Sequence, residues 1–591
     1  MLNSIVICVA LSAAAQDIAQ PEILVTASRA PETADATLAT VDVIERAEID
    51  RLQARDALEL LRRVAGVELA RTGGPGSATS LFMRGTNSNH TLVLIDGVRV
   101  ASVNTGAYTF EHLPIDLIDR IEIVRGPRAA IWGADALGGV VQVFTRRGSG
   151  YAAMLRAASE SDFSGSTTLG FGDHHRGANL SVQRRTRDGF SAQLPGSFGY
   201  DPDSDGLRQT SLSASAHGEL GEDVRVSGQI LASDADVEFD QGRSDVGQRS
   251  AALTLEHAIS ANFSQRLALT GARDEIETPV FFQRFDTKRE SLDWLGSLHT
   301  GVGDWQFGLS ALRERGGNFA IGFGDQYREL RRQRGIFGHW RGERAGHSGE
   351  IALRHDEVGD FGRETTGQAG WGWRSTEAMR VLASVGEGFR APNFNELYSP
   401  GFDGLFAGNP RLEPEHSRAL EIGVDLQLGT QQTLRLRAQR NRIRDLIGFT
   451  GTNFQARNVR RAQIESFEAD WQGQSGVWLW AAAATWQNPV DQDSGETLLR
   501  RARRKLSVDL DRPLGDRWNI GGSLYHASER RDFGAELGEY SLLDLRLAYA
   551  IGKHWRIESQ IANIFDEDYA LADGFATPGR NYQLTLRYRH D

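Results

Sequence analysis

The stretch Leu420-Glu-Ile-Gly-Val-Asp-Leu-Gln-Leu428 alternates apolar side chains with polar or small ones. Successive side chains of a β-strand point to opposite faces, so this period of two predicts a strand with one apolar face. Three further stretches in the last third of the chain, 433–439, 555–561 and 582–588, show the same alternation. A soluble β-sandwich also has such strands, so the alternation alone leaves the class of β-protein open.

The lengths of the connections between these strands help to decide the class of β-protein. Short turns are expected at 429–432, 473–476, 512–516 and 552–554, and long polar connections near 448–458, 488–500, 529–538 and 566–580. Antiparallel strands place every second connection at the same end, so one rim carries short turns and the other long loops. Outer-membrane barrels have this asymmetry. A sandwich whose connections alternate by chance over a few hairpins is the alternative.

The length of the chain indicates how large such a barrel is. From residue 150 onward, at roughly 20 residues for a strand and half its connections, there is room for about 22 strands, a size at which the lumen needs a plug. The segment before it has an amphipathic helix pattern over 56–64 ended by Gly66, short strand-like pieces, and glycine-rich loops at 72–80 and 103–107. The predicted fold is an all-β transmembrane barrel of about 22 antiparallel strands with an N-terminal mixed α/β plug domain inside the lumen.

Composition and the N-terminus exclude several classes of protein. The 591 residues carry a net charge of −12, which argues against a nucleic-acid binder. An apolar run over 5–15 ends in three alanines and predicts a signal peptide over 1–15. That run contains the single cysteine, Cys8, so the mature chain would have no disulfide and no thiol nucleophile. No apolar run of about 18 residues follows it, which leaves a periplasmic, secreted or barrel protein.

Several motifs occur in order along the chain. In the first 150 residues these are Leu81-Phe-Met-Arg-Gly-Thr-Asn87, Leu94-Ile-Asp-Gly-Val-Arg99, Ile121-Glu-Ile-Val-Arg-Gly-Pro-Arg128 and Trp132-Gly-Ala-Asp-Ala-Leu-Gly-Gly-Val140. Further on come 388–398, 408–415, 562–569 and 579–582. Together they resemble TonB-dependent outer-membrane receptors over nearly the whole mature chain. The compact length, the run 84–90 and the C-terminal hairpin are most similar to the cobalamin (vitamin B12) branch. One departure is the end, Tyr588-Arg-His-Asp591, where the family usually has a terminal aromatic residue.

The resemblance implies a function and a division of the chain. It implies a high-affinity receptor and TonB-energised transporter that brings cobalamin into the periplasm, as a monomeric barrel in the outer-membrane lipid of a Gram-negative bacterium. The expected segments are a signal peptide over 1–15, a periplasmic segment with the TonB box over 16–35, a plug over 36–148 and a barrel over 149–591. Alternatives are a receptor for a ferric siderophore or other iron chelate, and a surface binding or adhesion barrel without energised transport.

The TonB box is the segment that pairs as an added strand with the energy-transducing protein TonB. The resemblance places it at Glu22, Ile23, Leu24, Val25, Thr26 and Ala27, which include β-branched residues and carry no helix signal. Strand addition draws its affinity from backbone hydrogen bonds, so the side chains are loosely constrained. The alternative is an ordinary strand at the edge of the plug.

Substrate contacts are expected from the outward loops of the plug, 74–80 and 102–107. By resemblance, the contacting residues are Ser77, Ala78, Ser80 and Asn87 around the first loop, Asn104 and Thr105 in the second, and Arg531 on a long barrel loop. The residues of the two plug loops are small and polar, which lets backbone groups approach a large ligand. The alternative is that these are ordinary solvated loop residues.

Two acidic runs suggest a cation site. Asp201-Pro-Asp-Ser-Asp-Gly206 spaces carboxylates by two, as hard-cation loops do, and a second run over 233–240 with Asp245 is expected in a neighbouring loop of the same rim. The cobalamin branch binds calcium in the corresponding loops. Ca²⁺ is therefore predicted at Asp201, Asp203, Asp205, Asp234 and Asp245, with Asp240 as a further candidate. A solvated acidic surface is the alternative.

No catalytic residue or catalytic cofactor is predicted. The chain lacks a His-Glu-x-x-His helix, a Gly-x-Ser-x-Gly elbow, and a Gly-Lys-Ser/Thr after its glycine-rich stretch 133–139. A plug that fills the lumen also leaves little room for a hydrolase site assembled from distant loops.

Overall fold

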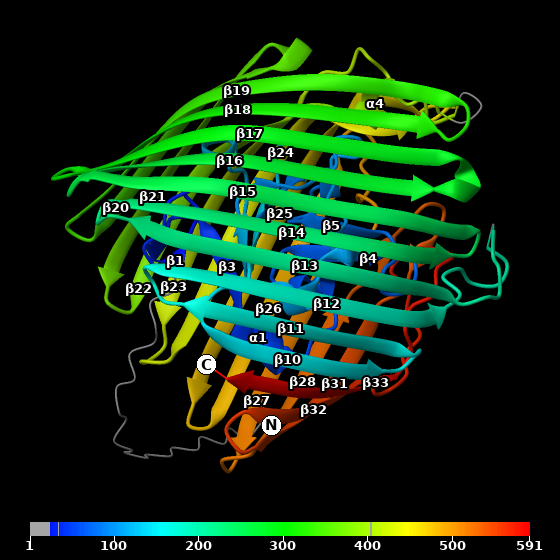
Figure 1. The fold of residues 1–591 in the computed structure, drawn as a ribbon. Helices are drawn as coiled ribbons and strands as arrows, with labels where there is room; N and C mark the ends of the chain where they lie inside the picture. Colours follow the sequence, from blue (N-terminus) through cyan, green and yellow to red (C-terminus); the bar gives the residue numbers. More distant parts are fainter. Residues whose placement is uncertain (1–23, 34, 198, 402–404, 591) are drawn as a thin grey trace, which may run out of the picture.

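The chain folds into a closed barrel around an N-terminal domain, in a computed structural model that describes residues 24–590 except 34, 198 and 402–404 (Figure 1). The predicted signal peptide and the first two residues of the predicted TonB box, Glu22 and Ile23, lie outside the described residues. The barrel has 22 antiparallel strands and closes where β10 pairs with β33. The predicted fold class and strand number are confirmed.

The strands of the barrel follow the chain in order around the wall. They are β10 Gly150–Ala158, β11 Asp162–Gly172, β12 Arg176–Phe190, β13 Asp205–Leu220, β14 Val224–Phe239, β15 Gly242–Ser260, β16 Phe263–Thr278, β17 Gln283–Thr300, β18 Gly303–Ala320, β19 Gly324–Arg344, β20 His347–Val358, β21 Arg363–Thr376, β22 Met379–Arg390, β23 Glu415–Gln427, β24 Gln432–Thr450, β25 Gln455–Ser475, β26 Trp478–Asp491, β27 Arg504–Leu514, β28 Trp518–Ala527, β31 Tyr540–Ile551, β32 Trp555–Ala562 and β33 Asn581–His590.

The two faces of the wall differ as the alternation predicts. In β33, Leu584 and Leu586 point outward and are exposed, whereas Gln583, Thr585 and Arg587 point inward and are buried against the plug. An apolar outer face and a polar inner face are the arrangement of a barrel that sits in lipid.

The two rims of the barrel also differ. One rim has turns of two to four residues, such as 221–223 and 552–554. The other has the long loops 191–204, 391–414, 492–503, 528–539 and 563–580. These loops contain α4 Phe394–Tyr398, β29 Arg530–Arg531 and β30 Glu536–Leu537. The same rim carries the short helices η4 Pro279–Phe281 and η5 Gly359–Phe361.

The prediction of a long connection near 448–458 is wrong. β24 and β25 run through it and turn at 451–454. These strands extend past the apolar belt, and we attribute the error to their polar outer face there, which removes the alternation used to recognise them.

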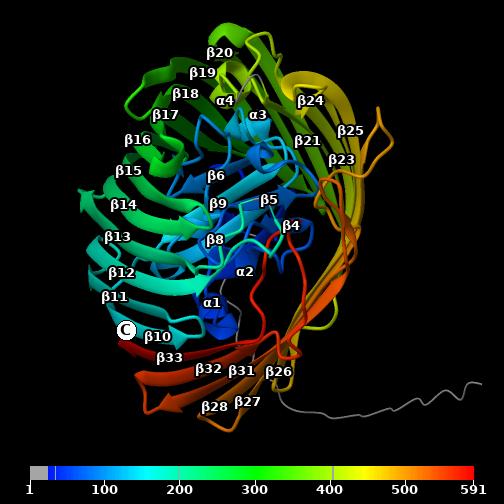
Figure 2. The same ribbon diagram turned by 90° about the vertical axis from the view of Figure 1, so that its right-hand side faces the viewer.

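The N-terminal domain fills the lumen (Figure 2). Its sheet has the order β3 Thr40–Glu45, β8 Ile118–Arg125, β9 Gly139–Thr145, β6 Thr91–Ile95 and β7 Val98–Arg99, with β6 and β9 parallel. Around it lie two small hairpins, β1 Leu24–Val25 with β2 Glu32–Thr33 and β4 Val67–Arg71 with β5 Thr79–Met83. The helices are α1 Arg46–Leu52, α2 Ala57–Leu61, α3 Ala129–Trp132 and the short η1 Ser88–His90, η2 Phe110–His112 and η3 Ile115–Leu117. None of the described helices is long and apolar enough to cross a membrane.

The predicted helix over 56–64 is shorter in the structure and begins at a cap. The carboxylate of Asp56 accepts a hydrogen bond from the backbone N–H of Glu59 at 2.9 Å and so satisfies one of the free N–H groups at the start of α2. Past its end, Lys505 of β27 points inward and donates to the carbonyl oxygens of Arg62 (3.1 Å), Val64 (2.6 Å) and Val67. A barrel side chain thus anchors the segment that joins α2 to β4.

Buried ion pairs attach the plug to the wall. Arg84 and Arg125, both from the motifs of the first 150 residues, contact Glu468 of β25 at 2.8 and 2.5 Å. Arg125 also contacts Asp470 at 3.0 Å. These opposite charges are buried and paired, so withdrawing either partner would leave an uncompensated charge in the lumen.

Candidate functional site

The first plug loop faces the rim with the long loops. It links β4 to β5, and its Ser77 and Ser80 are half-buried while Ala78 is exposed. The loop is fixed by an internal hydrogen bond from the Ser77 N–H to the Gly74 carbonyl at 3.1 Å. From the barrel, Arg187 donates to the Pro75 carbonyl at 3.2 Å. Small side chains on a fixed backbone make a surface that a large ligand can approach closely.

The second plug loop, 101–107, lies near the same rim against β17 and α4. Thr105 is exposed, but Asn104 is completely buried. Its amide nitrogen donates to the carbonyl of Asp286 at 3.0 Å, and its amide oxygen accepts from the Tyr327 hydroxyl at 3.0 Å. In this structure Asn104 therefore fixes the loop to the wall rather than presenting its side chain to a ligand.

Asn87 and Arg531 are both tied to the barrel loops. The amide oxygen of Asn87 accepts a hydrogen bond from Arg501 at 2.6 Å, and Arg531 forms an ion pair with Glu496 at 2.6 Å. Both side chains are half-buried.

The loop 391–414 is coupled to the plug through a buried chain of polar groups that sequence reasoning missed. His90 lies 2.9 Å from the Glu415 carboxylate, which also accepts from Arg390. Arg390 in turn makes two bonds to Glu396 of α4, at 2.9 and 3.0 Å. His90 and Glu415 are 325 residues apart in the sequence, so no local pattern could have revealed this link between plug and barrel.

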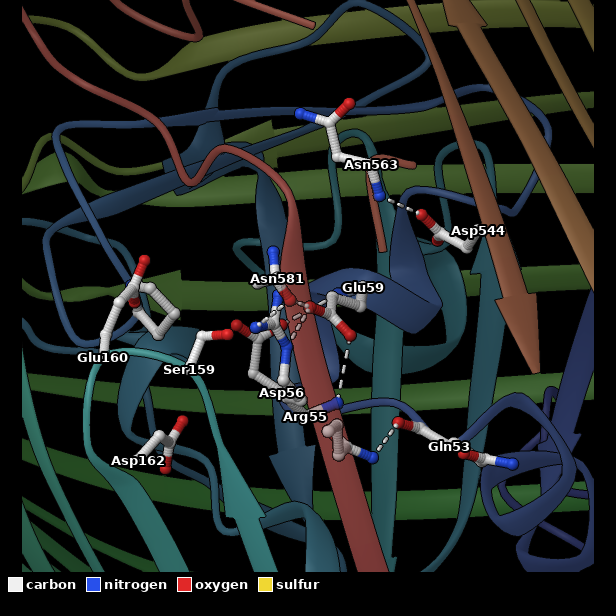
Figure 3. A network of polar contacts seen from close by, with 12 residues as sticks. Gln53, Arg55, Asp56, Glu59, Ser159, Glu160, Asp162, Asp544, Asn563 and Asn581 are labelled. Atoms are coloured by element: carbon white, nitrogen blue, oxygen red, sulfur yellow. Dashed lines mark hydrogen bonds and ion pairs between the residues drawn. The ribbon is translucent and has the colours of Figure 1, made fainter. Parts of the chain in front are cut away.

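A cavity of about 60 Å³ lies between α2 and the wall, beside the first plug loop. It is lined by apolar, aromatic and charged side chains that include Leu58, Arg62, Thr79, Tyr525, Tyr540 and Tyr569. Figure 3 shows part of its border, where Arg55 lies beside Asn581 of β33. Arg55 donates to the Asn581 amide oxygen at 2.7 Å and to Glu59 at 2.9 Å. No local sequence pattern predicts this cavity.

Four residues of the predicted cation set lie at the base of the loop 191–204. The Asp240 carboxylate accepts from the N–H groups of Gln193 and Asp201, at 2.9 and 3.1 Å, and Asp205 accepts from the Ala192 N–H at 2.5 Å. The other carboxylate oxygen of Asp205, Oδ1, is buried without a partner. Partial burial, together with the charges of Asp201, Asp240 and Glu238, raises the pKa of Asp203 above its ordinary value.

The other two predicted ligands lie elsewhere. The acidic run 233–240 was expected in a loop, but it belongs mostly to β14, which turns into β15 at 240–241. Ser233 and Ala235 are buried, so Asp234 between them points outward, where it pairs with Arg249 at 2.5 Å. Asp245 is also on the outer face and is half exposed. Among the described residues, no group of three or more acidic, His or Cys side chains is already arranged to hold a metal ion.

The described part of the predicted TonB box lies inside the lumen. Val25 is completely buried, and both the N–H and the hydroxyl of Thr26 donate to Glu122 of β8, at 2.9 and 2.7 Å. Trp132 donates to the Ala27 carbonyl at 3.1 Å, and Arg29 forms an ion pair with Asp293 of the wall at 2.8 Å. A partner protein could reach this segment only after these contacts open.

Comparison with known families decides what this architecture is. The family described as "TonB dependent receptor-like, beta-barrel" matches residues 150–564, and the "TonB-dependent Receptor Plug Domain" matches residues 33–140. The chain belongs to the TonB-dependent receptor family. It is a TonB-dependent receptor and transporter of the Gram-negative outer membrane, a family of transporters rather than enzymes. The rim with the long loops therefore faces the outside of the cell.

Individual relatives agree with this assignment. The chain is 29% identical to the vitamin B12 transporter BtuB of Vibrio vulnificus (strain YJ016), over 96% of this chain and 95% of that protein. The siderophore receptor PirA of Acinetobacter baumannii has a similar fold, with a TM-score of 0.79 and 16% identity over 93% of this chain and 98% of the other. The ferripyoverdine receptor of Pseudomonas aeruginosa also has a similar fold, with a TM-score of 0.80. It is 14% identical, over 96% of this chain and 88% of the other. At sequence identities of 16% and 14%, these two structures support the assignment of the fold alone.

Proposed function

We propose that this receptor imports cobalamin and that TonB energises the transport. The observation that carries the proposal is the match to a vitamin B12 transporter over 96% of the chain at 29% identity. The siderophore receptors with the same fold share only 14% and 16% of their residues with it.

The chemistry of the plug loops supports a neutral ligand. Residues 72–80 and 102–107 contain no charged side chain and consist mainly of Gly, Ser, Ala and Thr. Cyanocobalamin is large and carries no net charge, and it can be held by backbone groups and small polar side chains. A strongly charged ferric chelate would need charged partners to replace its hydration.

We assign the ligand contacts to the outward plug surface. Ser77, Ala78, Ser80 and Thr105 are the residues that this surface offers directly, with Asn87 and Arg531 joining after their present partners shift. Asn104 acts indirectly by holding the second loop in place, because its side chain is already fully used.

Energy coupling is proposed to run through residues 22–27. Strand addition to TonB needs a free backbone edge, and β1 now uses one edge to pair with β2. Withdrawal of Thr26 from Glu122 and of Arg29 from Asp293 would free the segment toward the periplasm. The burial of Val25 and the contacts of Thr26 and Ala27 keep the described part of the box from engaging TonB until such a change occurs.

A calcium ion is proposed at the base of the loop 191–204, held by Asp201, Asp203, Asp205 and Asp240. The partnerless Oδ1 of Asp205 fits this assignment because it is an unsatisfied acceptor among other carboxylates. A bound hard cation would supply the positive charge that this cluster lacks. Asp234 and Asp245 are left out of the site since they face outward.

An equilibrium titration tests the ligand assignment. Purified receptor is titrated with cyanocobalamin and, separately, with ferric siderophores of the catecholate and hydroxamate classes, each with Ca²⁺ and with a calcium chelator. We expect saturable binding of cyanocobalamin that weakens when calcium is removed. Binding of a ferric chelate with no binding of cyanocobalamin would contradict the proposal.

A further inference from the structure

The cavity between α2 and the wall adjoins the ligand surface of the first plug loop. Thr79 lines the cavity and directly follows Ala78, which is assigned to ligand contact. The wall contributes Tyr525 and Tyr540 from the extracellular ends of β28 and β31. Residues of the loop 563–580 complete the lining. The cavity therefore lies on the extracellular side of the plug, beneath this loop.

The lining of the cavity suits a flat ring. The rings of Tyr540 and Tyr569 are stacked, with their centroids 4.7 Å apart and 19° between their planes. Tyr525 lies 5.8 Å from Tyr540, and Leu542 and Leu571 belong to the same apolar cluster. One water molecule needs roughly 10–15 Å³, so a volume of about 60 Å³ has room for a ring system. An aromatic ligand group can stack on such side chains.

Arg62 supplies a cation with unused donors. It is half-buried at the end of α2, and its guanidinium carbon lies 5.2 Å from the centre of the Tyr525 ring. Its Nε is buried without a hydrogen-bond partner, and its Nη2 is 4.0 Å from the Asp544 carboxylate. A contact of 4.0 Å is too long for a hydrogen bond. The guanidinium therefore has donors left for a further anionic group.

The other charged side chains of the lining are already engaged. Arg55 donates to Glu59 at 2.9 Å, and Arg71 donates to Asp56 at 2.7 Å. Asp544 accepts from a backbone N–H of the loop 563–580 at 2.9 Å (Figure 3). Among the described residues that line the cavity, the guanidinium at the end of α2 is thus the charge left without a close partner.

We propose that this cavity binds the nucleotide tail of the corrinoid. In a cobalamin this tail is a flat benzimidazole base that is joined through ribose to a phosphodiester with one negative charge. The base stacks among Tyr525, Tyr540 and Tyr569, as aromatic bases do on tyrosine rings. The phosphodiester accepts charge-assisted hydrogen bonds from Arg62. This inference rests on the import of cobalamin proposed above, and it names the part of the ligand that the receptor distinguishes.

The tail enters from the outside of the cell. Tyr569, Leu571 and Pro578 belong to the loop 563–580, whereas the remaining lining comes mostly from strands of the wall and from the plug. In this proposal the loop shifts to admit the base and then covers it. The corrin ring stays on the adjoining first plug loop, whose surface without charged side chains suits its uncharged amides.

Titration of purified receptor with two corrinoids tests the inference. Cyanocobalamin has the tail, whereas dicyanocobinamide has the corrin ring without ribose, base or phosphate. Both are added, with Ca²⁺ present, to the wild type, Tyr540→Leu, Arg62→Gln and the matched control Arg249→Gln. The control removes an arginine of the outer face that is already paired with Asp234. Heat-modifiable migration on a gel shows that each barrel is folded.

We expect the wild type and the control to bind cyanocobalamin roughly tenfold more tightly than dicyanocobinamide. Tyr540→Leu and Arg62→Gln should each lower the affinity for cyanocobalamin by roughly threefold to tenfold. Neither substitution should change the affinity for dicyanocobinamide, because that ligand has no group to place in the cavity.

Three results would overturn the inference while leaving the proposed function intact. They are equal affinity of the wild type for the two corrinoids, a preference for cyanocobalamin that survives both substitutions, and an equal loss of affinity for both corrinoids in the variants. The last result would show that the cavity only supports the fold. Failure of the wild type to bind either corrinoid would contradict the proposed function and this inference with it.

Discussion

At the scale of single residues, the plug holds two adjacent titratable groups in their uncharged forms. Burial raises the pKa of Glu111 to about 8 and lowers the pKa of His112 to about 4. Consistent with this, one carboxyl oxygen of Glu111 and the Nδ1 of His112 are buried without hydrogen-bond partners. Both side chains belong to η2, under the second plug loop.

These two shifts act on stability in opposite directions. Between pH 4.5 and 8 the unfolded chain has lost the Glu111 proton that the folded plug keeps, so the free energy of unfolding falls as the pH rises. Between pH 6.5 and 4 the unfolded chain protonates His112 and the folded plug does not, so the free energy of unfolding falls as the pH drops. Above pH 6.5 only the effect of Glu111 remains.

Glu111→Gln should therefore stabilise the plug on the alkaline side. Relative to wild type, we expect the variant's free energy of unfolding to rise by about 1.4 kcal/mol per pH unit between pH 4.5 and 8. The variant should still lose stability below pH 6.5 because of His112. Urea unfolding in detergent micelles over this pH range measures both effects. A difference between variant and wild type that is the same at pH 5 and pH 8 would contradict the assignment.

Individual site residues show which features a sequence can predict. The outward loops and the exposure of Ala78 and Thr105 follow from local composition, because short runs of Gly, Ser and Thr between strands form surface loops. The burial of Asn104 depends on Asp286 and Tyr327, about 180 and 220 residues away. No local pattern encodes such partners.

At the scale of elements, the loop 191–204 is bound to a second extracellular loop of the barrel. Its Leu194 N–H donates to Gly574 at 2.9 Å, and its Ala192 carbonyl accepts from Ala576 at 2.8 Å, so it pairs with the loop 563–580. Asp205 and Asp240 hold the two ends of the loop together, because they accept from the N–H groups of Ala192 and Gln193 at its start and Asp240 also accepts from Asp201 near its end. A cation among these carboxylates would hold both long loops in one arrangement.

The carboxylates at the base of the loop 191–204 lead to a prediction about how calcium affects ligand binding. Asp205→Asn removes the negative charge of one proposed ligand, so the factor by which Ca²⁺ raises the affinity for cyanocobalamin should fall by roughly tenfold or more. Asp234→Asn is the matched control because that side chain faces outward and pairs with Arg249. Titrations with and without Ca²⁺ measure the effect. A calcium dependence lost in Asp234→Asn but kept in Asp205→Asn would contradict the site.

Strands were easier to predict than the loops that join them. Within the membrane, lipid on one side and the plug on the other impose the alternation that identified β23, β24, β32 and β33. Beyond the membrane both faces of a strand meet water, and the alternation weakens. This is why the outer ends of β24 and β25 resembled a loop, and why the acidic run in β14 did as well.

At the scale of the whole molecule, the plug and the barrel are a strongly connected pair. Arg84 and Arg125 of the plug share Glu468 of the wall, and Lys505 of the wall holds the plug segment that follows α2. Removing one partner of a buried ion pair typically costs about 3–5 kcal/mol. A substrate that passes through the lumen must disturb contacts of this kind. Because the plug is held so firmly, moving it requires an external supply of energy.

The proposed function of this receptor is the TonB-dependent import of cobalamin into the periplasm. Its most direct test is the accumulation of labelled cyanocobalamin by cells that lack their own cobalamin receptor and carry wild type, Val25→Pro or Val25→Ile. Proline cannot donate the backbone hydrogen bond that strand addition needs, whereas isoleucine can. We expect all three proteins to bind cyanocobalamin at the cell surface, with accumulation by the wild type and Val25→Ile and none by Val25→Pro. Accumulation by Val25→Pro at the wild-type rate would contradict the account.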